Sequence, residues 1–104
     1  MAHITGGGLT GNVPRVLPEG CTARIDPDTW PVPPIFTFLR ERGDVPVDEM
    51  YRTFNMGIGM ALVCAKADVS RVIAKLIGGG EVGAAPIGEI REGSPAVEYA
   101  HWDR

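Results

Sequence analysis

Apolar positions recur at the spacing of an α-helix in three stretches of this chain. A first helix is predicted to begin at Pro34 and to end at Gly43, because Pro favours the first helical position and Gly favours a C-terminal stop. A second begins at Pro46, and a third ends at the triple glycine 78–80, which we interpret as a C-cap and linker. The residues that would form the apolar faces are Ile35, Phe38 and Leu39, then Val47, Met50, Tyr51 and Phe54, then Val69, Val72, Ile73, Leu76 and Ile77.

Strand patterns lie between and after these helices. Residues 21–25 alternate weakly and end at a turn over residues 26–29. Residues 58–65 are continuously apolar and carry no charge, which is typical of a strand covered on both faces. Residues 84–90 and 96–102 are two further strand candidates. Strands that alternate with helices predict an α/β layered domain.

A triple glycine, residues 6–8, stands almost at the start of the chain. These glycines allow a backbone to approach a ligand closely, and Thr5 is placed to cap a short helix over residues 9–17. The N–H groups and the positive dipole end of such a helix suit a phosphate. A flexible N-terminal tail is the alternative. A strand normally holds such a loop, and only residues 1–4 precede it, so we expect either a tail or a chain that begins inside a longer fold.

Composition narrows the classes of function. The 104 residues suffice for one domain at most, and a net charge of −3 argues against an electrostatic nucleic-acid binder. The sequence contains no apolar run long enough to span a membrane and no visible secretory signal. The two cysteines make neither a disulfide framework nor a CxxC site, and Cys64 lies in an apolar run that predicts a buried thiol. We therefore expect a reducing, cytoplasmic setting.

Known ligand motifs match poorly. Gly6-x-Gly8-x-x-Gly11 formally fits the dinucleotide fingerprint, but the motif needs a preceding strand and a later acidic residue, and no Walker A lysine follows. His3 and His101 are isolated, and with the two cysteines they show no metal-ligand spacing.

A more informative stretch is residues 49–60, predicted to be a helix end, a glycine turn and a buried strand. Tyr51, Phe54 and Met60 are interpreted as core. Thr53 and Asn55 instead put polar groups at a turn beside that strand, where ligand sites of α/β proteins commonly lie.

Four segments taken together resemble one family, namely HITGGGL at 3–9, NVPRVLP at 12–18, WPVPPIF at 30–36 and EMYRTFNMGIGM at 49–60. They are similar to the C-terminal part of phosphoribosylformylglycinamidine cyclo-ligase, also called aminoimidazole ribonucleotide synthetase. The similarity runs from His3 to about residue 90. It implies an α/β (α+β) fold in which residues 1–104 are a partial C-terminal domain, with a mixed sheet packed with helices.

The resemblance implies an activity for the parent protein. ATP with Mg²⁺ would activate formylglycinamidine ribonucleotide, and ring closure would give aminoimidazole ribonucleotide in purine biosynthesis. An N-terminal domain, absent from these residues, would carry most of the residues that bind ATP and the metal. We therefore expect the fragment alone to be inactive. The parent would be a cytoplasmic homodimer that binds neither nucleic acid nor membrane.

The resemblance also implies site residues. Thr5, Gly6, Gly7 and Gly8 would form a loop at the substrate, against its ribose phosphate, and His3 would be the catalytic candidate for proton transfer. Residues that would line the cleft are Arg52, Thr53 and Asn55, and no residue here would bind metal. The alternatives are a non-catalytic α/β interaction module and a fragment of a related ATP-dependent synthetase.

Overall fold

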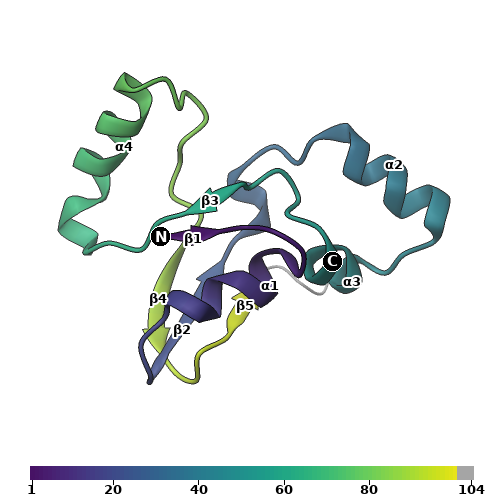
Figure 1. Ribbon diagram of the computed structural model, residues 1–104, viewed down its shortest axis with the longest axis horizontal. Coiled ribbons are helices and arrows are strands. Elements are labelled where there is room, and N and C mark those ends of the chain that lie inside the picture. Colours follow the sequence, from purple (N-terminus) through teal and green to yellow (C-terminus); the bar gives the residue numbers. More distant parts are fainter. Residues whose placement is uncertain (101–104) are drawn as a thin grey trace.

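The computed structural model describes residues 1–100 (Figure 1). Its α-helices are α1 Gly8–Asn12, α2 Pro34–Gly43, α3 Val47–Thr53 and α4 Val69–Gly78. Its strands are β1 Ala2–His3, β2 Cys21–Ile25, β3 Met60–Ala61, β4 Gly88–Glu92 and β5 Val97–Tyr99. Short 3-10 helices cover Val13–Val16, Pro27–Thr29 and Lys66–Asp68. Helices and mixed strands together confirm the predicted α/β (α+β) class.

The strands form two small sheets. In the larger sheet β2 is central and pairs antiparallel with β4 and parallel with β5, so that Ala23 lies opposite both Ile90 and Val97. In the smaller sheet β1 pairs antiparallel with β3, with Ala2 opposite Ala61. The N–H of Ile4 extends this pairing by donating to the carbonyl of Gly59 at 2.9 Å. The N-terminal segment is therefore anchored, and the alternative of a flexible tail is wrong.

The hydrophobic core lies where α1, β2 and α3 meet. Leu9 of α1 and Met50 of α3 are its largest fully buried side chains. Other core residues are Ala2, Ile4, Val13, Leu17, Ala23, Ile25, Trp30, Tyr51 and Met56. The indole Nε1 of Trp30 donates to the carbonyl of Met56 at 3.0 Å, which fastens the extended segment before α2 to the turn after α3.

The predicted buried strand over residues 58–65 is wrong in length and in burial. Only Met60–Ala61 is a strand, and the side chains of Met60, Leu62 and Val63 are 50%, 45% and 44% exposed. The thiol of Cys64, predicted to be buried, is exposed as well. The physical reason is that β3 pairs only with the two-residue β1, so the sheet is too small to cover the run.

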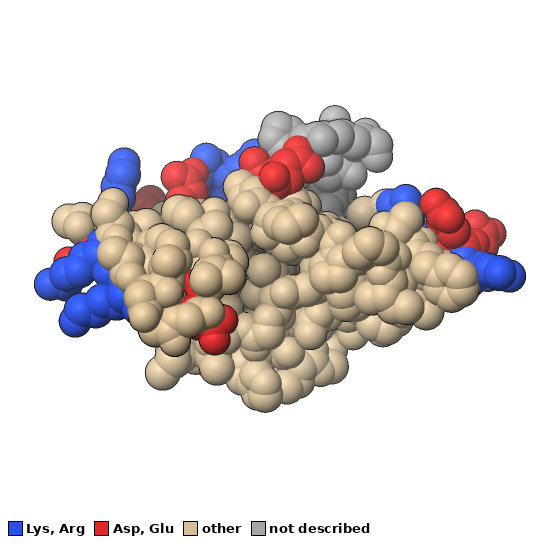
Figure 2. All heavy atoms as spheres, turned by 90° about the horizontal axis from the view of Figure 1, so that it is seen from above, with Lys and Arg blue, Asp and Glu red and all other residues tan. Residues whose placement is uncertain are grey.

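Helices α2 and α4 form as predicted, but neither contains a buried residue. Figure 1 shows them at opposite ends of the molecule, with the two sheets between them. Ile35 and Phe38 of α2 are 54% and 51% exposed. The space-filling view of Figure 2 shows a broad middle with few charged side chains and Lys and Arg gathered toward the two ends.

The helix ends agree with prediction in one case. After α4 the N–H of Gly79 donates to the carbonyls of Lys75 and Leu76, which confirms the C-cap function of the triple glycine. At α2 the predicted stop at Gly43 is one residue early, because Gly43 is still helical and Asp44 takes the left-handed cap conformation at φ 50°.

The last two strand predictions are confirmed as β4 and β5 with different bounds, because β4 begins at Gly88 and continues to Glu92, beyond the predicted end at residue 90, and β5 covers only Val97–Tyr99. The end of the 96–102 prediction, including His101, lies outside the described residues. Within residues 1–100, no helix combines the length and the apolar character needed to cross a membrane.

Candidate functional site

The glycine loop turns tightly into α1. Gly7 is the N-cap of α1 with a left-handed φ of 96°, and Gly8 follows with a φ of 59°. The prediction that Thr5 caps this helix is wrong, because its hydroxyl donates to Asn12 Oδ1 at 3.3 Å, and its carbonyl accepts from the N–H of Gly8 at 3.0 Å. The helix is also shorter than predicted and continues as the 3-10 helix Val13–Val16, with Pro14 in the first turn of that 3-10 helix.

The three glycines of the loop, residues 6–8, lie in different surroundings. A Cβ on Gly8 would come within 3.0 Å of the backbone carbonyls of Tyr51 and Phe54, so this glycine is required by the close approach of α1 to α3. A Cβ on Gly6 would meet nothing within 4 Å. The N–H groups of Gly6 and Gly7 donate to no backbone carbonyl of the described residues. The open, donor-bearing side of the loop is therefore at Gly6 and Gly7.

Asn12 holds the loop in this shape, and the sequence reasoning missed it. The residue is only 3% exposed, and its Nδ2 donates to the carbonyls of Gly8 at 2.8 Å and of Thr5 and Gly6 at 3.3 Å. The two N–H hydrogens of this buried amide are shared among three carbonyls, and its oxygen accepts the Thr5 hydroxyl, so one side chain fixes the backbone on both sides of the turn. An amide residue four positions after Gly8, within the short helix predicted over residues 9–17, was the available signal.

The turn after α3 is fixed mainly by its own residues. The side chain of Asn55 accepts the N–H of Gly57 through Oδ1 at 2.8 Å. Met56 and Gly57 both have positive φ, 53° and 99°, and a Cβ on Gly57 would lie 2.5 Å from Pro33 Cδ. Arg52 makes an exposed ion pair with Glu49 at 3.2 Å. The side-chain oxygen of Asn55 therefore already stabilises this turn.

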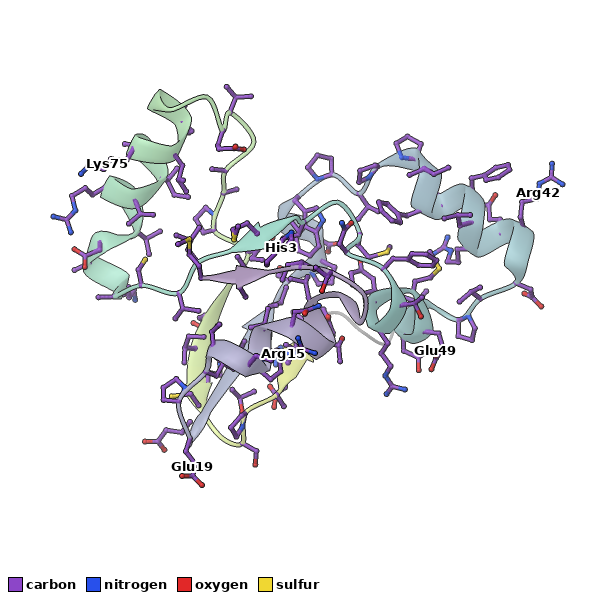
Figure 3. All side chains as sticks on the ribbon, in the orientation of Figure 1. His3, Arg15, Glu19, Arg42, Glu49 and Lys75 are labelled. Atoms are coloured by element: carbon purple, nitrogen blue, oxygen red, sulfur yellow. The ribbon has the colours of Figure 1, made fainter. Side chains whose placement is uncertain are left out.

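The structure brings the predicted site residues to one junction between two segments. Residues 3–8 run beside residues 54–61, since His3 lies opposite Met60, Ile4 bonds to Gly59, and Gly8 packs against Phe54. Thr5, Arg52 and Thr53 are exposed at this junction. His3, labelled in Figure 3 beside β1 and β3, is exposed, and its ring has no hydrogen-bond partner among the described residues. The catalytic and binding roles of these residues stay predictions.

A pair of tyrosines packs between α3 and β5, next to the junction. The rings of Tyr51 on α3 and Tyr99 on β5 are 5.1 Å apart, and the Tyr99 hydroxyl is 2.8 Å from Thr10 Oγ1 on α1. Burial raises the pKa of Tyr99 to about 12, because the charged phenolate would lose hydration, although its hydrogen bond to Thr10 opposes the shift. Burial also raises the pKa of Tyr51, assisted by the negative charge of Asp28 and opposed by Arg40. Both phenols are therefore neutral at physiological pH.

The chemistry available at the junction is that of a binding surface. It offers backbone N–H donors, the Thr5 and Thr53 hydroxyls, one imidazole and the ion-paired guanidinium of Arg52. In the described part of the chain, no three side chains among His, Cys, Asp and Glu gather closely enough to hold a metal ion. These side chains could therefore orient an anionic substrate and exchange a proton at His3, but they do not by themselves form a Mg²⁺ site.

Comparison with known proteins gives consistent matches. Residues 1–100 match the family described as AIR synthase related protein, C-terminal domain. The chain is 56% identical over 91 residues to a phosphoribosylformylglycinamidine cyclo-ligase of Trichlorobacter lovleyi and 55% identical over 92 residues to one of Cupriavidus pinatubonensis, and each match covers 88% of this chain. A relative of the same name in Burkholderia lata is 57% identical over 81 residues, or 78% of the chain. The matched segments span 26%, 26% and 23% of these relatives, so the chain corresponds to about a quarter of their length.

Proposed function

Because the chain belongs to the family of AIR synthase related C-terminal domains, we propose that it contributes the substrate side of a phosphoribosylformylglycinamidine cyclo-ligase. The reaction is the ATP-dependent ring closure of formylglycinamidine ribonucleotide to aminoimidazole ribonucleotide in purine biosynthesis. The observation that carries the proposal is the 55–57% identity to relatives of that name across more than three quarters of the chain. In this proposal the parent protein is a cytoplasmic homodimer.

The glycine loop would bind the ribose phosphate of the substrate. The open space around Gly6 and the N–H groups of Gly6 and Gly7 support this role, because backbone donors at a glycine turn suit phosphate oxygens. Thr5 would add a hydroxyl, although that hydroxyl already donates to Asn12. Gly8 acts indirectly, since it allows α1 to lie against α3.

The remaining site residues would line the cleft. His3 would exchange a proton with the substrate, which its exposed position beside the loop permits. Arg52 and Thr53 would contact the substrate from the end of α3. Asn55 would do so through its amide nitrogen, because its oxygen accepts the N–H of Gly57.

ATP and Mg²⁺ would be bound mainly by an N-terminal domain outside these residues. ATP would supply the phosphoryl group that activates the substrate amide oxygen. The isolated chain is therefore expected to show no turnover of ATP and formylglycinamidine ribonucleotide, and turnover by the isolated chain would contradict this part of the proposal.

A chimera tests the proposal. Residues 1–100 would replace the matching segment of the Trichlorobacter lovleyi cyclo-ligase, and the chimera would be expressed in cells that lack their own enzyme. We expect growth without added purines. A folded, soluble chimera that fails to support growth would refute the proposal and favour the non-catalytic interaction module.

The loop is tested within the active chimera by Gly6→Val. The site has room for the side chain, so folding should be kept, whereas β-branched bulk beside the N–H groups should raise KM for the ribonucleotide about tenfold or more. Gly83→Val is the matched control, because that glycine is also in open space and lies far from the loop in the sequence. Equal KM values for the two variants would remove the loop from the site.

A further inference from the structure

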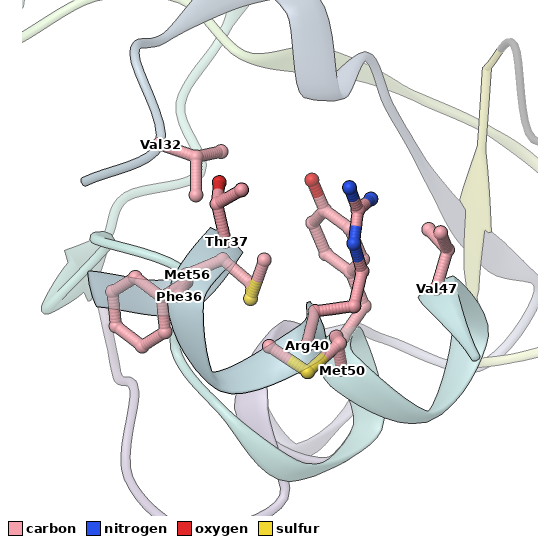
Figure 4. Close-up of a pocket in the computed structure, with 8 residues that line it drawn as sticks. Val32, Phe36, Thr37, Arg40, Val47, Met50 and Met56 are labelled. Atoms are coloured by element: carbon pink, nitrogen blue, oxygen red, sulfur yellow. The ribbon is translucent and has the colours of Figure 1, made fainter. Parts of the chain in front are cut away.

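A cleft between α2 and α3 lies outside the junction described above (Figure 4). Its volume is about 130 Å³. Apolar side chains from the two helices and the adjoining loops form its walls, namely Val32, Phe36, Val47, Met50 and Met56. Tyr51 adjoins both features, because its backbone carbonyl lies against Gly8 and the residue also lines the cleft, but no residue of the glycine loop lines the cleft.

The volume of the cleft limits its ligand to a small molecule. An apolar protein cavity of about 150 Å³ is known to accept benzene, so about 130 Å³ suits one ring or a short branched chain. The methionines add adaptability, since thioether side chains repack at little cost and contact aromatic edges favourably. Met50 is fully buried and Met56 is 6% exposed, so both form the floor of the cleft, and Met50 has to shift for a ligand to contact it.

The polar end of the cleft is cationic. Figure 4 shows the Thr37 hydroxyl and the Arg40 guanidinium pointing to the same side, in the space between Val32 and Val47. Among the described residues Arg40 makes no salt bridge, like Arg15 and Arg42, whereas Arg24, Arg52, Arg71 and Arg91 each pair with a carboxylate. A guanidinium matches a carboxylate with two parallel hydrogen bonds.

The carboxylate of Asp28 opposes the attraction that Arg40 exerts on an anion. Asp28 raises the pKa of the Tyr51 phenol and Arg40 lowers it, so the two charges act in opposite directions on this hydroxyl. Arg40 lines the cleft directly and Asp28 does not. At the Tyr51 hydroxyl the effect of Asp28 is larger than that of Arg40, so an anion would have to contact Arg40 directly to gain from its charge.

We propose that the cleft between α2 and α3 binds a small organic monocarboxylate with a single ring or branched apolar body. The carboxylate lies on Arg40 and Thr37, and the apolar body lies on Met50 and Met56. This site does not depend on the proposed ligase function, because it uses none of the residues assigned to the substrate.

Benzoate is the probe, and the methionine methyl groups report its position. The full chain, labelled with ¹³C at the methionine methyls, is titrated with benzoate in the millimolar range. We expect ring-current shifts of Met50 and Met56, with Met1 and Met60 unmoved, since those two lie outside the cleft and are exposed. Benzyl alcohol, which lacks the charge, and inorganic phosphate, which lacks the ring, should each bind at least tenfold more weakly. Equal shifts at all four methionines, or equal affinity for benzyl alcohol, would overturn the proposal.

Substitutions test the charge. Arg40→Ala should weaken benzoate binding about tenfold, and Asp28→Asn should tighten it about two- to threefold. Arg42→Ala is the matched control, because Arg42 lies on the same helix with its guanidinium 5.3 Å from the Phe38 ring and does not line the cleft. An Arg40→Ala chain with native methionine spectra and unchanged benzoate affinity would overturn the proposal, as would equal losses in the Arg40 and Arg42 variants.

Discussion

At the scale of single residues, Gly8 sets how closely the glycine loop lies against α3. Gly8→Ala places a Cβ within 3.0 Å of two backbone carbonyls and strains a φ of 59°. We expect a loss of about 2–4 kcal/mol in the free energy of unfolding, measured by denaturant titration. Gly6→Ala is the control and should change stability by less than about 1 kcal/mol, because its site is open. Equal stabilities of the two variants would contradict the packing role of Gly8.

Tyr99 makes stability depend on pH in the alkaline range. Its pKa is raised from 10.0 to about 12 in the folded chain, so the folded state keeps a proton that the unfolded state releases above pH 10. The contribution is therefore fully present below pH 10 and is lost as the pH rises toward 12. Its upper bound is about 3 kcal/mol, from two pKa units at about 1.4 kcal/mol each.

Tyr99→Phe tests this dependence. Between pH 10 and 12 the free energy of unfolding should fall less in the variant than in the parent chain. A smaller fall with pH, due to the raised pKa of Tyr51, should remain in both chains. The measurement is denaturant unfolding at a series of pH values, with tyrosinate absorbance recorded in parallel. Identical slopes would show that the Tyr99 phenol titrates alike in the folded and unfolded chains.

At the scale of elements, Asn12 ties α1 to the glycine loop. Asn12→Ala leaves the carbonyls of Gly6 and Gly8 without their side-chain donor and should cost about 2–3 kcal/mol of unfolding free energy. Thr5→Val removes one long, partly buried hydroxyl bond to the same amide and should cost about 1 kcal/mol or less. Amide hydrogen exchange at residues 6–8 should quicken much more in the Asn12 variant. Equal exchange rates in the two variants would show that the amide does not hold the loop.

Local sequence signals predicted the elements that depend on local chemistry. Pro34 is the first residue of α2, and Pro46 directly precedes α3. The helical spacing of apolar residues predicted the extent of α4. The five-residue β2 agrees with its predicted bounds, since Asp26-Pro27 ends it. These features follow from dihedral preferences and capping, which a single segment carries by itself.

Features that depend on contacts between distant segments could not be predicted from the sequence in this way. The apolar run 58–65 predicts a strand, but its burial depends on neighbouring elements, and β1 supplies only two residues. The anchored position of the glycine loop depends on the pairing of residues 2–4 with residues 59–61. The role of Asn12 depends on its burial under that loop. Sequence reasoning therefore found the residues of the junction but not what holds them.

At the scale of the whole molecule, apolar surface is distributed unevenly. The charged side chains of Lys and Arg gather toward the ends in the view of Figure 2, whereas several large apolar side chains remain open to solvent. One group of exposed apolar side chains in a short segment is Met60, Leu62 and Val63. Contiguous apolar surface with an adjoining strand edge favours association with another apolar surface.

We therefore expect the isolated chain to self-associate through residues 60–63 at concentrations of tens of micromolar, as measured by sedimentation velocity. Leu62→Lys should raise the apparent dissociation constant by about tenfold or more, because a charge would have to be desolvated in the contact. Ser70→Lys on α4 is the matched control, since it adds the same charge at an exposed polar position and should leave association within about twofold. If both variants weaken association equally, net charge rather than the apolar segment governs it. A monomeric parent chain at these concentrations would show that the 60–63 surface is too small, or too irregular at its edge, to drive association alone.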